Sequence, residues 1–146
     1  MQPKEVSRAI IYDDDGRVLL AKRARGAGEG QWALIGGKPE NGEKPIETVV
    51  REVLEETGLT FSPTPLRVEV DDTHDPEGTP WRVSYFYGQA VGTFALLADE
   101  NSEARYFSRN ELPALSIAFG HLHILEEFLD TALRNSALLN YPGHTK

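Results

Sequence analysis

The sequence predicts an α/β sandwich in which strands of mixed direction are flanked by two helices. In segments 45–57 and 120–134, apolar residues recur every three or four positions, as they do along one face of a helix. Several shorter segments are rich in β-branched and aromatic residues and are separated by turn residues, which is typical of strands. Helices and strands in this arrangement pack as layers around a shared core.

The part of the chain before the first helix predicts three strands. Residues 5–12 and 17–23 flank the turn Asp13-Asp14-Asp15-Gly16, and we expect them to pair as a hairpin. Residues 25–30 form a loop that contains glycine. A short strand at 31–35 then leads into Gly36 and Gly37, and a polar loop follows at 39–43.

The first helix has clear end signals. Pro45 suits the first turn of a helix, and Gly58 suits the position just past its end, where a left-handed residue is often needed. Residues three and four apart share a helix face. An apolar stripe on one side is formed by Ile46, Val49, Val50 and Val53. An acidic cluster on another side is formed by Glu52, Glu55 and Glu56.

The second half of the chain predicts further strands and the last helix. Segments 66–72 and 81–92 read as strands, and the loop between them, 73–80, carries two prolines, a glycine and several acids. Residues 105–108 form a short strand. We expect the helix at 120–134 to be followed by a frayed tail at 139–146.

Composition limits the class of protein. With 146 residues, the chain is long enough for one domain spanning 1–146, and it has no cysteine for disulfides or thiolate metal sites. It also lacks a stretch of about 20 apolar residues and an apolar leader, so we expect a cytoplasmic protein with no membrane partner. The net charge of −8 argues against nucleic acid as a partner.

The acidic cluster on the first helix predicts a metal site. Three carboxylates on one face repel each other unless a cation lies among them, and Mg²⁺ prefers a few carboxylates together with waters and phosphate oxygens. Bound Mg²⁺ can neutralise a diphosphate and activate water for attack on it. The alternative is a solvated helix face whose acids bind nothing.

Residues 37–59 also resemble the Nudix box at every fixed position of that motif. The matching residues are Gly37, Glu43, Arg51, Glu52, Val53, Glu55, Glu56, Gly58 and Leu59. The resemblance implies the Nudix α/β/α sandwich with a mixed β-sheet. It also implies a magnesium-dependent hydrolase of phosphoanhydrides, in which Mn²⁺ could replace Mg²⁺.

The resemblance further implies roles for residues of the box. Glu52, Glu55 and Glu56 would bind the metal, and a carbonyl of the glycine loop, assigned to Gly37, would also be a ligand. Glu52 and Glu55 are the predicted catalytic carboxylates. Arg51 would orient Glu43, although a simple surface ion pair explains that pairing equally well. Where the family often has proline before the paired glycines, this chain has Ile35, and Pro39 stands where an apolar residue is usual.

A further metal ligand or general base often comes from a late loop in this family. Glu103 is the first candidate, because Glu-Ala-Arg-Tyr-Phe resembles the family's glutamate followed by an aromatic strand, and Glu100 is its rival. The alternative for both is a solvated acidic loop.

Four residues that are not fixed positions of the box are candidates for substrate binding. Arg23, Arg25 and Lys38 could contact phosphate oxygens, and Phe119 could stack on a base or sugar. Solvated cations and core packing are the alternatives.

The expected partner is a small nucleotide, and relatives of this family often form homodimers. The favoured substrate is a nucleoside diphosphate linked to another group, either ADP-ribose or a nucleotide sugar. Two resemblances favour this substrate. His121 lies in a segment resembling the phenylalanine-acid-histidine signature of family members that act on ADP-ribose-like compounds, with Gly120 in place of the acid. Pro76 lies near the position where such enzymes carry proline. The alternatives are an (oxidised) nucleoside triphosphate pyrophosphohydrolase and a non-catalytic nucleotide-sensing domain.

Overall fold

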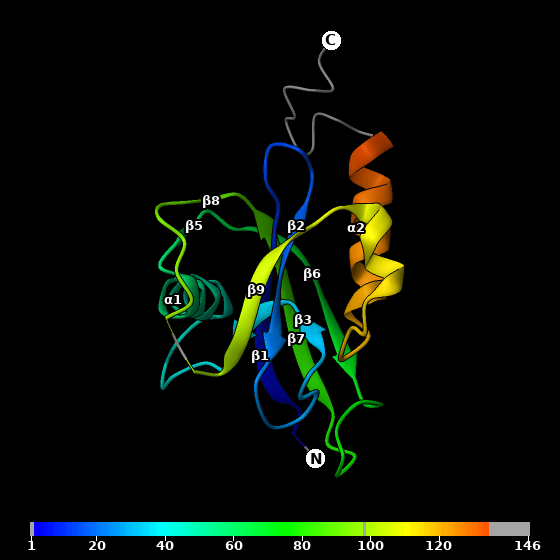
Figure 1. The fold of residues 1–146 in the computed structure, drawn as a ribbon. Helices are drawn as coiled ribbons and strands as arrows, with labels where there is room; N and C mark the ends of the chain where they lie inside the picture. The colour runs from blue at the N-terminus through cyan, green and yellow to red at the C-terminus, as the bar shows by residue number, and fades with distance from the viewer. Residues whose placement is uncertain (1, 98, 135–146) are drawn as a thin grey trace.

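The computed structural model describes residues 2–97 and 99–134 and has the predicted α/β architecture (Figure 1). Its elements are β1 (Lys4–Ile11), β2 (Val18–Arg23), β3 (Trp32–Ala33), β4 (Ile35–Gly37), α1 (Pro45–Thr57), β5 (Thr60–Phe61), β6 (Thr64–Asp71), β7 (Trp81–Gly88), β8 (Ala90–Val91), β9 (Asn101–Phe107), the 3₁₀ helix η1 (Arg109–Ala114) and α2 (His121–Arg134). The predicted frayed tail at 139–146 lies outside the described residues.

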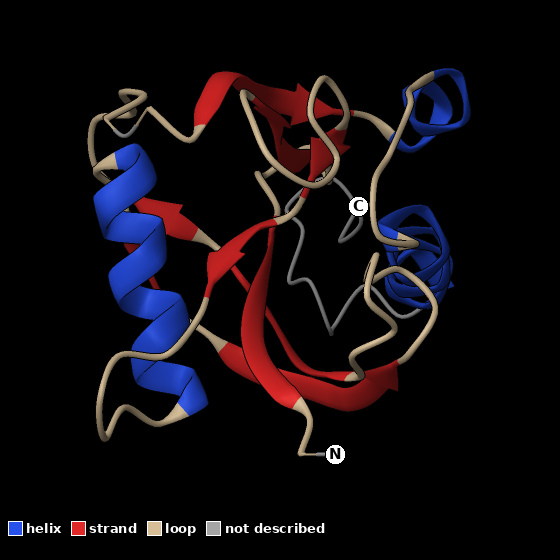
Figure 2. Ribbon diagram, turned by 90° about the horizontal axis from the view of Figure 1, so that it is seen from below, coloured by secondary structure: helices blue, strands red, loops and turns tan. Residues whose placement is uncertain are grey.

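Two sheets form the middle of the molecule, and α1 and α2 lie on opposite sides of them (Figure 2). The larger sheet has the order β4-β1-β7-β6, in which β1 and β7 are parallel and the other pairs are antiparallel. The second sheet has the order β3-β2-β9, and β5 pairs with β8. The expected sandwich with a mixed sheet is therefore confirmed.

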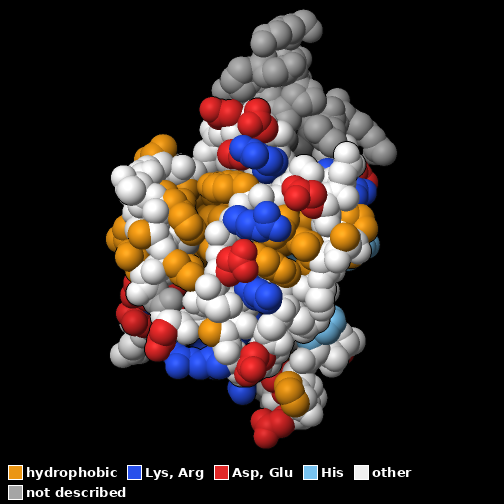
Figure 3. All heavy atoms as spheres, viewed as in Figure 1, with side chains coloured by type: hydrophobic (Ala, Val, Ile, Leu, Met, Phe, Trp, Pro, Cys, Tyr) orange, Lys and Arg blue, Asp and Glu red, His pale blue; other side chains and the backbone are white. Residues whose placement is uncertain are grey.

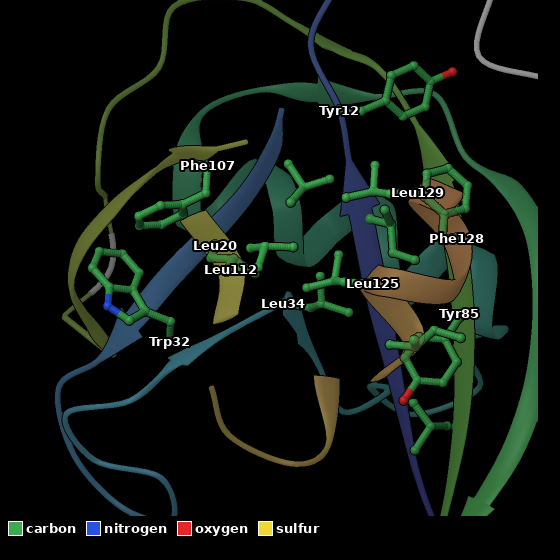
Figure 4. Packing of buried hydrophobic residues seen from close by; sticks show 14 of the residues in the cluster. Tyr12, Leu20, Trp32, Leu34, Tyr85, Phe107, Leu112, Leu125, Phe128 and Leu129 are labelled. Atoms are coloured by element: carbon green, nitrogen blue, oxygen red, sulfur yellow. The ribbon is translucent and has the colours of Figure 1, made fainter. Parts of the chain in front are cut away.

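The alternation of side chains along the strands divides the core into two clusters. On the α2 side, inward residues of β1 and β2 such as Ile10 and Leu20 pack with Leu125 and Phe128 (Figure 4). On the α1 side, the intervening residues such as Ile11 and Leu19 pack with Val49 and Val53. Both faces of these strands are buried, so helices are needed on both sides.

Helix α1 begins and ends as predicted. Pro45 occupies the first turn, and Gly58 follows the helix in the left-handed conformation with φ 75° and donates its N–H to Leu54. The Ser7 hydroxyl donates to the Pro45 carbonyl at 3.0 Å, which ties the start of the helix to β1. The acidic residues of the helix are thereby placed against the end of the β1–β4 pair.

Residues 5–12 and 17–23 do not form the predicted hairpin. Their backbone pairing is limited to the turn, where Tyr12 bridges Val18, and β1 and β2 then enter different sheets. The local turn signal was read correctly, but β1 finds partners in β4 and β7, and β2 finds them in β3 and β9. Long-range pairing that buries both faces prevails over the local hairpin.

The predicted strands at 31–35 and 81–92 are each divided. β3 and β4 belong to different sheets, with Leu34 at the crossing, and β7 and β8 are likewise separated. The strand predicted at 105–108 begins earlier, at Asn101. Within the described part of the chain, no helix is both long and apolar enough to cross a bilayer.

Candidate metal and substrate site

Three carboxylates from two parts of the chain meet at the end of the β1–β4 pair. Glu52 and Glu56 come from α1, and Glu100 comes from the segment just before β9. Each offers an oxygen that lies within 4.8 Å of the others. Oxygen ligands at this spacing, from more than one element, suit a hard divalent cation.

Glu56 is the buried member of this group. Only 4% of the residue is exposed, and its Oε1 accepts a hydrogen bond from the Asn101 amide at 2.8 Å. Its Oε2 is buried and has no hydrogen-bond partner in the described structure. Burial, together with the neighbouring Glu52, raises the pKa of Glu56 to about 8. Such an oxygen needs either a proton or a cation.

Glu52 is less buried, with 14% of its side chain exposed. Burial raises its pKa, and the carboxylates of Glu100 and Glu55 act in the same direction. Burial disfavours the charged form of both acids, and repulsion between neighbouring carboxylates acts in the same direction, although Arg51 contacts Glu52 at 3.3 Å. The residues present therefore fit a metal ion: three carboxylates, one with an unsatisfied buried oxygen.

The acid that joins Glu52 and Glu56 from the second half of the chain is Glu100, the second of the two candidates in that loop. Glu103, the first candidate, lies within β9 opposite Lys22, with about half of its side chain exposed and its carboxylate 3.9 Å from Arg105. Basic and acidic side chains alternate down the middle of the face that carries β9 (Figure 3), as on a solvated sheet face. The sequence prediction placed Glu103 before a strand at 105–108, whereas β9 begins at Asn101 and therefore contains it.

Arg51 occupies the centre of an ion-pair network. Its guanidinium donates to both oxygens of Glu43, at 2.7 and 3.0 Å, and to the Lys38 carbonyl at 3.0 Å. These hydrogen bonds lower the pKa of Glu43 to about 2. Arg51 also donates to Glu55 at 3.0 Å and to Glu52 at 3.3 Å. It thus orients the side of α1 that carries the acids.

Glu55 is turned away from the three-carboxylate group. Its side chain is 52% exposed and paired with Arg51. Of the three box glutamates predicted as metal ligands, the structure brings Glu52 and Glu56 together with Glu100 and leaves Glu55 at the rim.

Two positions of β4 must be glycine because neighbouring atoms lie too close to leave room for a Cβ. A Cβ on Gly37 would lie 2.1 Å from Glu52 Oε2, and a Cβ on Gly36 would lie 1.9 Å from the Ser7 carbonyl oxygen of β1. Gly37 therefore makes room for a carboxylate, whereas Gly36 makes room for the neighbouring strand. A metal-ligating carbonyl at Gly37 stays a prediction.

A cavity of about 580 Å³ opens beside the carboxylates. Glu52 and Glu100 line one part of it, and the loop that follows β6 lines another, with His74, Pro76 and Trp81 near it. Of the predicted substrate-binding residues, Arg23, Lys38 and Phe119 line the cavity. Arg25 is not among its lining residues and pairs with Asp99 at 2.9 Å in an exposed position.

Sequence reasoning missed Arg8, which also lines the cavity. An available signal was the alternation of β1, because Arg8 shares its face with the core residues Val6 and Ile10. A charged residue at an inward position of a buried strand is unusual. Asn101 was also missed, and no sequence pattern distinguishes it.

His121 is 2% exposed and has a fixed tautomer. Its Nδ1 accepts the Leu34 N–H at 3.1 Å, so the proton of the neutral ring is on Nε2. Burial lowers its pKa well below 6.5. Leu34 needs this bond because it lies where the chain crosses between sheets. The structural role of His121 is therefore evident, and its ring also lines the cavity.

Phe119 adopts a left-handed backbone conformation with φ 61°. For a residue with a bulky side chain, this conformation costs about 1–2 kcal/mol. Its ring lies 5.5 Å from the His121 ring, nearly edge to face. Strain of this kind, kept at a cavity wall, points to a functional position.

Comparisons with known proteins give a consistent result. The sequence profile of the NUDIX domain matches residues 3–128. ADP-ribose pyrophosphatase of Methanocaldococcus jannaschii is 35% identical over 120 residues, covering 82% of this chain and 69% of that protein. Human 8-oxo-dGDP phosphatase NUDT18 is 30% identical over 122 residues, and this chain spans only 36% of its length.

Solved structures include a similar fold. The crystal structure of a MutT NUDIX hydrolase from Burkholderia pseudomallei superposes with a TM-score of 0.77 at 28% identity. The match covers 87% of this chain and 98% of that one.

Proposed function

Because this chain belongs to the Nudix hydrolase family, we propose that it hydrolyses the phosphoanhydride bond of a nucleoside diphosphate linked to another group, with Mg²⁺ as cofactor. ADP-ribose is the favoured substrate. Water would add across the P–O–P linkage and yield AMP and ribose 5-phosphate. The observation that carries this proposal is the cluster of three carboxylates formed by Glu52, Glu56 and Glu100.

Each residue near this group has a distinct task in the proposal. Glu52, Glu56 and Glu100 would hold the metal, which when bound would neutralise phosphate charge and lower the pKa of a water. Asn101 holds one oxygen of Glu56 and leaves the other free for the metal. Arg51 fixes the position of Glu52 and keeps Glu55 at the rim, so its task is to orient the carboxylates and not to bind phosphate.

The substrate's remaining part would occupy the cavity of about 580 Å³, which is large enough for a nucleoside. Arg23 and Lys38 line it and can donate to phosphate oxygens. Support for ADP-ribose comes from the relative named ADP-ribose pyrophosphatase and from Pro76 and His121, which both line the cavity.

An oxidised purine nucleotide is the second candidate. It is favoured by the relative named 8-oxo-dGDP phosphatase, which is 30% identical to this chain. The two candidates differ in products: ADP-ribose gives AMP and ribose 5-phosphate, whereas the nucleotides give inorganic phosphate or pyrophosphate.

A substrate panel tests the proposal. Purified protein would be supplied with ADP-ribose, UDP-glucose, 8-oxo-dGDP and 8-oxo-dGTP, each with Mg²⁺, with Mn²⁺ or with EDTA, and products would be separated by ion-exchange chromatography. We expect metal-dependent turnover with the highest kcat/KM for ADP-ribose. A marked preference for 8-oxo-dGTP would reject ADP-ribose, and turnover that persists in EDTA would reject the metal.

Matched variants test the ligand assignment. Glu100→Gln should reduce kcat at least tenfold, because a carboxylate of the metal group loses its charge. Glu103→Gln, which makes the same change two residues away from Asn101 on the exposed face of β9, should leave kcat close to that of the wild type. The reverse pattern would restore Glu103 as the late acid.

A further inference from the structure

Arg8 is a cation in the cavity that the metal site does not explain. It is partly buried on β1, and one of its N–H groups donates to the Leu34 carbonyl at 3.0 Å. Its other donors are not engaged by a carboxylate: within the described residues, no acidic oxygen lies within 4.0 Å of the guanidinium. Burial lowers the pKa of Arg8 to about 10, which leaves the group charged at neutral pH.

Arg23 is a second cation facing the same cavity. Its Nε donates to the Ala27 carbonyl at 2.7 Å, and the described structure contains no ion pair for it either. Arg23 is paired with Asn101 across the β2–β9 ladder, next to Glu100. It therefore lies beside the metal group, with its guanidinium anchored through a single N–H.

The ring of Phe119 lies close to both guanidiniums. The ring centre of Phe119 is 5.5 Å from the guanidinium carbon of Arg8 and 5.3 Å from that of Arg23. Arginine stacks favourably on an aromatic ring, and the strained backbone of Phe119 keeps the ring in this place. Phe119 therefore positions the two arginines, and its contacts with them differ from the expected stacking on a base.

Arg8 and Arg23 carry like charges that repel each other, and Arg23 is one of the groups that lower the pKa of Arg8. Arg8 also feels the carboxylates of Glu56 and Glu52, but at a distance and without contact. Once a metal ion takes up those carboxylates, the arginines have no compensating charge. Charges that are partly withdrawn from water are normally paired, so we expect the ligand to bring the partner for these arginines.

We propose that Arg8 and Arg23, positioned by Phe119, form a phosphate subsite that binds the substrate phosphate not held by the metal ion. The inference rests on the proposed function, because it assigns a second phosphate of the same substrate. Arginine binds phosphate through two parallel N–H donors, and each of these arginines keeps donors free for that purpose. Arg8 is thus a substrate-binding residue that selects for a diphosphate.

Binding of inorganic pyrophosphate without metal tests the subsite directly. Isothermal titration in EDTA at pH 7.5 would compare the wild type with Arg8→Gln, Arg8→Lys and Arg82→Gln. Arg82 is exposed on β7 and does not line the cavity, so its replacement makes the same charge change elsewhere. We expect binding to weaken at least tenfold in Arg8→Gln, less in Arg8→Lys, and not in Arg82→Gln. Equal affinity in the wild type and Arg8→Gln, or no binding by the wild type, would overturn the proposal.

Thermal unfolding distinguishes a phosphate-binding role of Arg8 from a purely structural one. Removing an unpaired, partly buried cation should leave the unfolding temperature of metal-free Arg8→Gln at or above that of the wild type. Pyrophosphate should raise the unfolding temperature of the wild type but not that of Arg8→Gln. Suppose that both Arg8 variants unfold at a much lower temperature than the wild type and that pyrophosphate still stabilises them. Arg8 would then have a structural role only.

Failure of this inference can be told apart from failure of the proposed function. Glu52→Gln should abolish turnover yet keep metal-free pyrophosphate binding, since it removes a charge that repels the anion. With an active substrate, Arg8→Gln should raise KM at least tenfold with a smaller change in kcat, as expected for binding lost equally in ground and transition states. If no substrate in the panel is hydrolysed, the pyrophosphate titration still decides for or against the subsite.

Discussion

Replacing Glu56 with glutamine should stabilise the metal-free protein at alkaline pH. The folded protein holds the Glu56 proton up to a pKa of about 8, whereas an ordinary glutamate loses it near 4.5. Between these values the unfolded chain binds fewer protons, so the free energy of unfolding falls as the pH rises. Each pH unit in this window lowers it by about 1.4 kcal/mol, which amounts to about 4 kcal/mol by pH 8. Glutamine keeps the shape of the side chain and removes this penalty.

Urea unfolding in EDTA at pH 5 and pH 8 measures the effect. The loss of unfolding free energy between the two pH values should be greater in the wild type than in Glu56→Gln by about 3.5 kcal/mol. Groups remote from the site contribute alike to both proteins, so the difference reports Glu56 together with its neighbour Glu52, which acts on the pKa of Glu56. Glu29→Gln, which changes an exposed loop residue, should behave as the wild type does. Identical pH dependence in the wild type and Glu56→Gln would refute the buried, unpaired carboxylate.

Magnesium should reverse the penalty. At pH 8, saturating Mg²⁺ binds the folded wild type and raises its free energy of unfolding, by about 2.7 kcal/mol at a hundredfold excess over Kd. It should have little effect on Glu56→Gln, which has lost a ligand. The affinity of the wild type for Mg²⁺ should also increase between pH 6 and pH 8, as the ion no longer competes with a proton.

Three further outcomes follow from the close contacts around the site. Gly37→Ala should fold, because the atoms nearest to the new Cβ all belong to the flexible side chain of Glu52. Mg²⁺ affinity in isothermal titration should fall about tenfold as that ligand is displaced, and unchanged affinity would contradict the contact. Gly36→Ala would instead push a Cβ into the backbone of β1 and should cost about 3 kcal/mol or more in urea unfolding, so a variant as stable as Gly37→Ala would refute the assigned packing. Asn101→Ala removes the donor to Glu56 and should lower the free energy of unfolding by about 1–3 kcal/mol at pH 8; no change there would mean that the hydrogen bond is unimportant.

Helix α1 and its acids could be predicted because their signals are local. The period of the apolar residues, Pro45 at the start and Gly58 at the end each act within one or two turns of the chain. The pairing of Arg51 with Glu43 likewise joins residues only eight positions apart, across the start and about two turns of the helix. Such features need no knowledge of distant segments.

The errors of prediction occurred where distant segments decide. The hairpin expected from the turn at residues 13–16 did not form, because β1 and β2 each bury both faces in separate sheets. The sequence could not tell which of Glu100 and Glu103 lies beside Glu52 and Glu56. That depends on where β9 begins and on which of its side chains face solvent. A shift of one residue along a strand exchanges its inward and outward side chains.

The sequence by itself determined that this chain carries a helix with clustered carboxylates, next to a glycine turn and an arginine, and hence the family to which it belongs. Only the tertiary structure decided that Glu100 completes that cluster and that Arg8 faces the cavity. The physical reason is that helix periodicity and end signals are written in neighbouring residues. The partners of a buried charge are instead set by strands that lie far apart in the chain.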